Sequence, residues 1–148
     1  QLFLGITFNY GLLLGWSSTN TEISIIPLFF YIGAIFWTLG YDTIYGFQDI
    51  KDDEIIGVKS TSIKFKNNPK KFLSLCYLLF ITSILLIHKI MNFSNYTYFI
   101  IFLIFLHLFF FQIMSFKIEN KDMSLKIFKS NNSLGLLILL CLFIGKIY

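Results

Sequence analysis

Long apolar stretches constrain the fold of this chain more than any other feature. Four of them cover roughly residues 24–47, 69–90, 95–116 and 127–147, and a shorter one covers residues 1–16. Each of the four is long enough to cross a bilayer as a helix, which takes roughly 20 apolar residues. Transmembrane strands would alternate polar and apolar side chains, and these stretches do not. The sequence therefore predicts an all-α, multi-span transmembrane helical bundle with about five spans, the first of which is only the end of a span.

The placement of positive charge predicts the orientation in the membrane. All twelve basic residues are lysines, and ten of them fall in the loops that follow the second and fourth spans. The loops at 17–23 and 91–95 contain none. Because basic loops stay on the cytoplasmic side, we expect the loop at about 46–70 to lie in the cytoplasm. We expect the membrane that this multi-pass protein occupies to be a bacterial inner (plasma) membrane. No basic patch is interleaved with aromatic residues, so no nucleic-acid partner is predicted.

An acidic segment lies at the cytoplasmic mouth of the second span. It contains Asp42, Asp49, Asp52 and Asp53, which are four of the eight acidic residues of the chain. Carboxylates next to hydrocarbon are costly and usually have a function. If the preceding helix continues through this segment, Asp42, Asp49 and Asp53 share a narrow stripe with Tyr45, whereas Asp52 points to the side. Three carboxylates directed at one spot predict a binding site for a divalent metal ion.

Other residues in the spans have simpler interpretations. Cys76 and Cys141 each lie alone within a span, without partners at metal-binding spacing, and are predicted to be small packing residues. His107 lies in the middle of a span, where a hydrogen bond to a neighbouring helix is expected rather than metal ligation. The acidic segment itself has an alternative interpretation as a solvated loop with charges of both signs.

The segment from Tyr41 to Thr61 resembles the second aspartate-rich motif of the UbiA superfamily of membrane prenyltransferases. The family pattern Y-D-T-x-Y-A-x-x-D-x-x-D-D, followed by I-G-x-K-S-T, is matched at Tyr41, Asp42, Thr43, Tyr45, Asp49, Asp52, Asp53, Ile56, Gly57, Lys59, Ser60 and Thr61. Gly46 replaces the alanine of the pattern. A weaker similarity joins residues 128–135 to the asparagine-rich start of the last helix of the family.

The resemblance covers the whole chain, from the fifth to the ninth helix of a nine-helix fold. It implies that residues 1–148 form a single integral-membrane domain with the active-site loop at about 46–70. The first motif of the family, N-D-x-x-D, is absent from the sequence. We therefore expect this chain to be the C-terminal half of a prenyltransferase, with the missing N-terminal half as its partner, and to be inactive alone.

The chemistry implied by the resemblance is Mg²⁺-dependent transfer of a polyprenyl group. The donor would be a polyprenyl diphosphate and the acceptor the ring of 4-hydroxybenzoate, in ubiquinone biosynthesis. Mg²⁺ prefers carboxylate and phosphate oxygens. Asp49 and Asp53, one helical turn apart, are the expected ligands of one ion, and Asp42 is expected to join through water. These three residues are therefore predicted to be catalytic.

The diphosphate would be held by residues around the carboxylates. Lys59 can supply a positive charge, and Ser60 and Thr61 can donate hydrogen bonds. Tyr45 can hydrogen-bond a phosphate oxygen or stabilise the allylic cation with its ring. These four residues are the predicted substrate-binding set.

Three alternatives stay open at this point. The acceptor could be another aromatic compound, such as a naphthoate, although the run Lys59-Ser60-Thr61 favours the benzoate branch. The chain could also be a non-catalytic membrane subunit. An ion transporter would place its carboxylates near the membrane midplane at broken helices, whereas here they lie at the end of a span.

Overall fold

The computed structural model describes residues 1–20 and 24–147, which form helices joined by short connections and contain no strand. The helices are α1 (Leu2–Phe8), α2 (Tyr10–Thr19), α3 (Ile25–Gly46), α4 (Ile50–Ile56), α5 (Thr61–Lys64), α6 (Pro69–Ile90), α7 (Tyr96–Leu106), the π-helix η1 (His107–Ile113) and α8 (Lys121–Ile147). The predicted all-α bundle is confirmed.

Four helical segments in this described part are long and apolar enough to cross a membrane. They are Ile25–Gly46, Pro69–Ile90, Tyr96–Ile113 and Lys121–Lys146. The third runs without interruption through α7 and η1. The multi-span prediction is therefore confirmed, and its boundaries agree with the apolar stretches of the sequence to within a few residues at most ends.

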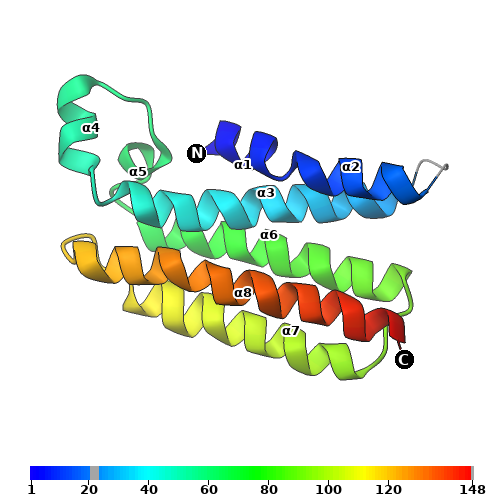
Figure 1. Cartoon of the computed structure of the whole chain (residues 1–148). Helices are drawn as coiled ribbons and strands as arrows, with labels where there is room; N and C mark the ends of the chain where they lie inside the picture. The colour runs from blue at the N-terminus through cyan, green and yellow to red at the C-terminus, as the bar shows by residue number, and fades with distance from the viewer. Residues whose placement is uncertain (21–23, 148) are drawn as a thin grey trace.

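The short apolar segment at residues 1–16 forms two helices, α1 and α2, which run alongside α3 (Figure 1). They meet at Asn9, whose side-chain amide donates to the Gly5 carbonyl and to the Thr38 hydroxyl, each at 2.8 Å. The amide thus satisfies backbone and side-chain oxygens at the place where the helix is interrupted, and it ties this segment to α3.

The two lysine-bearing loops lie at the same end of the bundle. Figure 1 shows α4, α5 and the connection into α8 at one end, and the C-terminal end of α2, the N-terminal end of α3 and the connection α6–α7 at the other. The Nζ of Lys70, at the start of α6, donates to the Met114 carbonyl after η1 at 3.3 Å. We call the end that contains residues 47–68 and 114–120 the lysine-rich end. Its existence agrees with the alternation of lysine-bearing and lysine-free loops along the chain.

Helices α3 and α6 pack closely because glycines of α3 face side chains of α6. An ideal Cβ on Gly33 would lie 2.6 Å from the Cβ of Ser83, and one on Gly40 would collide with the ring of Tyr77. Between these two points Trp37 stacks on Phe80, with ring centroids 5.4 Å apart. Small residues allow helix backbones to approach in a membrane, so this packing fixes α3, which carries Asp42, against α6.

Candidate functional site

The helix that carries the acidic segment does not continue through it. Helix α3 ends at Gly46, and α4 begins at Ile50 with Asp49 as its N-cap residue. Phe47 and Ile50 are both buried, and the ring of Phe47 packs against Phe116 with centroids 5.2 Å apart. The turn at residues 47–49 therefore puts both apolar side chains into the core. The expectation of one continuous helix through residues 42–53 is wrong.

As a consequence the carboxylates divide into two groups. Asp49 and Asp53 lie one turn apart at the start of α4, where the Asp53 amide donates to the Asp49 carbonyl at 2.9 Å. Asp49 and Asp52 are exposed, Asp53 is partly exposed, and Asp42 is half-buried on α3. Within residues 1–20 and 24–147, no three His, Cys, Asp or Glu side chains gather closely enough to hold a metal ion. The predicted convergence of three carboxylates on one spot is therefore not formed by this chain.

Asp42 lines a cavity of about 410 Å³ between α1, α3 and α8. The lining residues are Leu4, Phe8, Trp37, Tyr41, Asp42, Phe128, Asn131, Asn132 and Gly135. The Tyr41 ring packs edge-on against Trp37 and against Phe128, with centroids 5.7 Å and 5.6 Å apart. The cavity thus unites Asp42 of the aspartate-rich segment with two asparagines of α8, Asn131 and Asn132. It offers aromatic walls and one carboxylate.

A buried hydrogen-bond network lies next to this cavity. Asn131 Oδ1 accepts from Trp37 Nε1 at 2.9 Å and from Gln112 Nε2 at 3.0 Å. The amide of Asn131 donates to the carbonyls of Ile127 and Phe128, both at 3.1 Å. The hydroxyl of Tyr77 donates to Gln112 Oε1. One asparagine therefore fixes α8 to α3 and η1 beside the cavity.

Sequence reasoning missed the members of this network other than Asn131. The available signal was Gln112, a polar residue within an apolar span, because polar groups inside a membrane segment usually face the interior and find partners. Gln112 lies in the π-helix η1, and such segments often occur at functional sites. Trp37 and Tyr77 gave no signal, since aromatic residues are common throughout this chain.

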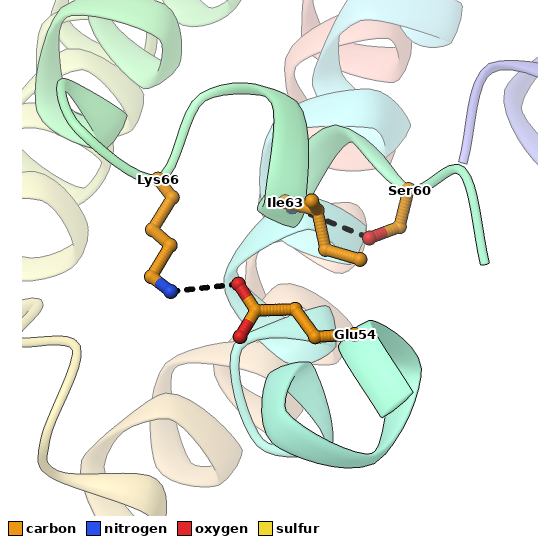
Figure 2. Close-up of polar contacts among 4 residues, drawn as sticks. All are labelled: Glu54, Ser60, Ile63 and Lys66. Atoms are coloured by element: carbon orange, nitrogen blue, oxygen red, sulfur yellow. Dashed lines mark hydrogen bonds and ion pairs between the residues drawn. The ribbon is translucent and has the colours of Figure 1, made fainter. Parts of the chain in front are cut away.

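The predicted diphosphate-binding hydroxyls hold the loop together. The Oγ1 atoms of Thr61 and Thr43 lie 2.6 Å apart, and Ser62 Oγ donates to the Thr43 carbonyl at 3.0 Å. Ser60 is the N-cap residue of α5, and its Oγ accepts from the Ile63 amide at 3.3 Å (Figure 2). The contacts of Thr61 and Ser62 dock α5 against α3, and that of Ser60 caps α5. They do not test the predicted contacts of Ser60 and Thr61 with a diphosphate.

An exposed ion pair links the two sides of the same loop. Lys66 Nζ lies 2.6 Å from a carboxylate oxygen of Glu54, and both side chains keep access to solvent (Figure 2). Such exposed pairs contribute only about 0.2–1 kcal/mol. The pair therefore helps to orient α4 relative to the segment after α5 but does not dominate the stability of the loop.

The remaining predicted residues occupy the same end of the bundle. Lys59 is exposed in the connection between α4 and α5, two residues after Gly57, which adopts the left-handed conformation with φ of 80°. Tyr45 is exposed on the last turn of α3, and its ring packs on that of Phe128 with ring centroids 4.6 Å apart. Tyr45 and Tyr41 thus both contact the ring of Phe128, next to Asp42.

The structure confirms the simpler interpretations of the span residues. His107 Nε2 pairs with Ser130 Oγ on α8 at 3.0 Å. Cys76 and Cys141 are free and buried. All three therefore take part in packing between the helices, as expected.

Comparison with known proteins assigns a family. Residues 1–147 match the UbiA prenyltransferase family. The chain is 37% identical to the mitochondrial 4-hydroxybenzoate polyprenyltransferase of Aedes aegypti, 36% to that of Rattus norvegicus and 35% to that of Homo sapiens, each over 100% of this chain. The chain spans 34% of the length of the first relative and 40% of the other two. No solved structure matches the chain.

These relatives overturn the predicted location. All three come from eukaryotes and are named as mitochondrial proteins. The expectation of a bacterial inner membrane is therefore wrong, and the relatives point to a mitochondrial membrane. The charge pattern could not reveal this, because the distribution of lysines reports which loops share a side of the membrane and not which membrane the protein occupies.

Proposed function

This chain belongs to the UbiA prenyltransferase family, and we propose that the full-length protein transfers a polyprenyl group from a polyprenyl diphosphate to the ring of 4-hydroxybenzoate in a mitochondrial membrane. The names of the relatives support the choice of acceptor. The observation that carries the proposal is the cavity that brings Tyr41 and Asp42 together with Asn131 and Asn132. The proposal concerns the full-length protein.

Mg²⁺ is the proposed cofactor, and the carboxylates of α4 fit part of its usual surroundings. Proteins typically hold Mg²⁺ with one or two carboxylates, and phosphate oxygens and water complete the shell. Asp49 and Asp53 would supply this pair, since they lie one turn apart with access to solvent. Asp42 would join from the neighbouring cavity through water. When bound, the ion would neutralise negative charge on the departing diphosphate.

Residues of the loop would bind the rest of the diphosphate. Lys59 is exposed and would place its ammonium group against phosphate oxygens. Thr61 already holds α5 against α3, and Ser60 caps α5, so they would position the segment that follows Lys59 as well as contact phosphate. This double role places binding groups on a docked segment rather than on a free loop.

The aromatic walls of the cavity suit both reaction partners. The rings of Tyr41 and Tyr45 each contact the ring of Phe128, and Tyr41 and Phe128 line the cavity together with Asp42. Aromatic faces attract cations, so these rings would stabilise the allylic cation that forms when the diphosphate leaves. Its carbon would then be attacked by the acceptor ring, which would restore its aromaticity by losing a proton. Asn132, exposed at the cavity, can hydrogen-bond a polar substituent of the acceptor.

The proposal is tested by product analysis with the full-length protein. Purified protein would be incubated with a polyprenyl diphosphate, Mg²⁺ and either 4-hydroxybenzoate or a hydroxynaphthoate, and the extracted lipid would be identified by mass spectrometry. Prenylated 4-hydroxybenzoate together with released diphosphate is the expected result. Product from the naphthoate alone would contradict the acceptor assignment, and diphosphate release with neither acceptor prenylated would contradict the transfer.

A further inference from the structure

A second polar cavity lies at the lysine-rich end and shares no lining residue with the cavity of Asp42. It has a volume of about 480 Å³ and is formed by the start of α6 and the connection between η1 and α8. Its charged lining residues are Lys70, Lys71, Lys117 and Glu119. We call it the basic pocket. None of the predicted catalytic or diphosphate-binding residues lines it.

Positive charge predominates in the basic pocket. Its three lysines and Glu119 are all exposed. The Nζ of Lys70 donates to the Met114 carbonyl at 3.3 Å, which draws this side chain across to η1. Among residues 1–20 and 24–147, the ion pair that the structure contains joins Lys66 and Glu54, so the pocket lysines are not neutralised by carboxylates. The pocket therefore attracts anions.

The position of two of these lysines on α6 strengthens this conclusion. Pro69 is the first residue of α6, so Lys70 and Lys71 lie in its first turn, which contains no acidic residue. Asn68, at the N-cap, makes no side-chain capping bond. The helix dipole is positive at this end and disfavours lysines there, while the first amides need acceptors. An anion bound in the pocket would offset the positive charge of the lysines and the helix end, and it would accept hydrogen bonds from the first amides of α6.

Apolar side chains continue from the pocket toward the middle of the membrane. Lys71, Leu75 and Leu78 follow the spacing i, i+4, i+7 and share one face of α6. Leu75 and Leu78 are each 57% exposed. On the neighbouring segment Phe110 and Met114 are 58% and 62% exposed. Each element thus presents a basic or polar end at the membrane surface and an apolar surface further along the span.

We propose that the basic pocket binds the phosphate headgroup of an acidic phospholipid, whose acyl chains lie on the apolar faces of α6 and η1. The phosphate would contact Lys71 and Lys117 from two loops that are distant in the sequence, together with the first amides of α6. Basic pockets between spans are known to suit such headgroups. The exposed apolar side chains favour a lipid over a soluble phosphate. This site is independent of the proposed transfer reaction.

The test uses the full-length protein purified and delipidated in a neutral detergent. Binding of phosphatidylglycerol and of phosphatidylcholine would be measured by native mass spectrometry, with inorganic phosphate as a soluble competitor. The variant Lys71→Gln/Lys117→Gln removes one charge from each side of the pocket. Lys121→Gln/Lys126→Gln is the matched control, because both residues are exposed lysines of α8 outside the pocket lining. Glu119→Gln removes the opposing charge.

Phosphatidylglycerol should bind more tightly than phosphatidylcholine, and the pocket variant should weaken its binding roughly tenfold. The control variant should retain binding, Glu119→Gln should strengthen it, and inorganic phosphate should not displace the lipid. An equal loss in the control would show general surface attraction and overturn the proposal. Displacement by inorganic phosphate would overturn the assignment to a lipid. A variant whose melting temperature in phosphatidylcholine equals that of the parent protein is folded, and only such variants are compared. Glu119→Gln tests the pocket by a predicted gain of binding, which loss of folding cannot produce.

Discussion

Trp37 and Asn131 are joined by a hydrogen bond of 2.9 Å from the indole Nε1 to the amide oxygen. This bond connects α3, which carries the start of the aspartate-rich segment, to the last helix of the chain. Both residues also line the cavity of Asp42. Asn131 therefore helps to set the relative position of the two helices at this cavity, together with the contacts of Phe128.

Replacement of that asparagine by leucine should destabilise the full-length protein. In Asn131→Leu, the donors of Trp37 and Gln112 lose their shared acceptor, and an unsatisfied buried polar group costs about 1–3 kcal/mol. Asn132→Leu is the control, because Asn132 is adjacent and exposed. Thermal unfolding in detergent would measure both. Equal stability of the two variants would contradict the role of Asn131.

The contact between Thr61 and Thr43 predicts a difference between two substitutions. Thr61→Val keeps the shape of the side chain but removes the hydroxyl, and the loss of one hydrogen bond costs about 0.5–1.5 kcal/mol. Thr61→Ser keeps the hydroxyl. We expect the valine variant to be less stable and to have a higher KM for polyprenyl diphosphate, with both effects largely restored in the serine variant. A wild-type KM of the Thr61→Val variant would show that the Thr61 hydroxyl does not contribute to binding of the diphosphate.

The carboxylates of α4 are expected to differ in their effect on turnover. Asp49→Ala or Asp53→Ala should abolish product formation by the full-length protein, because each removes an anionic ligand that water cannot replace. Asp52→Ala should have a milder effect and is the matched control on the same turn. Turnover would be measured over a range of Mg²⁺ concentrations. Wild-type activity of either Asp49→Ala or Asp53→Ala at limiting Mg²⁺ would exclude that residue as a ligand.

The sequence was sufficient for the four long apolar helices and for the common end of the lysine-bearing loops, although residues 1–16, expected as the end of a fifth span, form the separate helices α1 and α2 (Figure 1). The four long helices and the common end follow from hydropathy and charge, which are properties of local segments. The break at residues 47–49 could not be read in the same way. It depends on the burial of Phe47 against Phe116, a contact between segments far apart in the chain. For this reason the prediction from helical periodicity alone extended α3 beyond Gly46, where the helix ends.

The candidate site was predicted only in part. Asp42 and residues 128–135 were singled out by pattern, and the structure places Asp42, Asn131 and Asn132 at one cavity. The hydrogen bonds that hold Asn131, by contrast, come from Trp37 and Gln112 in two other helices. A single sequence does not reveal which polar groups of different spans meet, because the rotation of each helix about its axis is set by packing.

The close contact of Gly40 with the Tyr77 ring predicts a position that does not tolerate a methyl group. Gly40→Ala should force the ring to move, and overpacking of this kind costs about 1–3 kcal/mol. Gly15→Ala is the control, because no atom lies within 4 Å of a Cβ added there. Since alanine is the better helix former by about 1 kcal/mol, the control should be as stable as the parent or more so. Unfolding temperatures of both variants would measure the difference. Equal stability of the Gly40→Ala variant and the parent would contradict the close contact with Tyr77.

The shared location of the lysine-bearing loops predicts the labelling pattern of cysteines in the full-length protein. Cys76 and Cys141 are buried and would be replaced by alanine to give a background without native thiols. Asn67→Cys and Asn95→Cys lie at exposed positions at opposite ends of α6 and its following turn. In sealed vesicles of one orientation, a membrane-impermeant thiol reagent should label one of them, and the other should react only after permeabilisation.

A third cysteine position extends this experiment to the next span, α7–η1. Lys121→Cys is exposed at the start of α8, so it should follow the pattern of Asn67→Cys and not that of Asn95→Cys. Its place follows from one further crossing, through α7–η1, which returns the chain to the lysine-rich end. Labelling of Asn67→Cys and Asn95→Cys from the same side would show that α6 does not cross the membrane. Labelling of Lys121→Cys with Asn95→Cys would show that the segment α7–η1 does not cross.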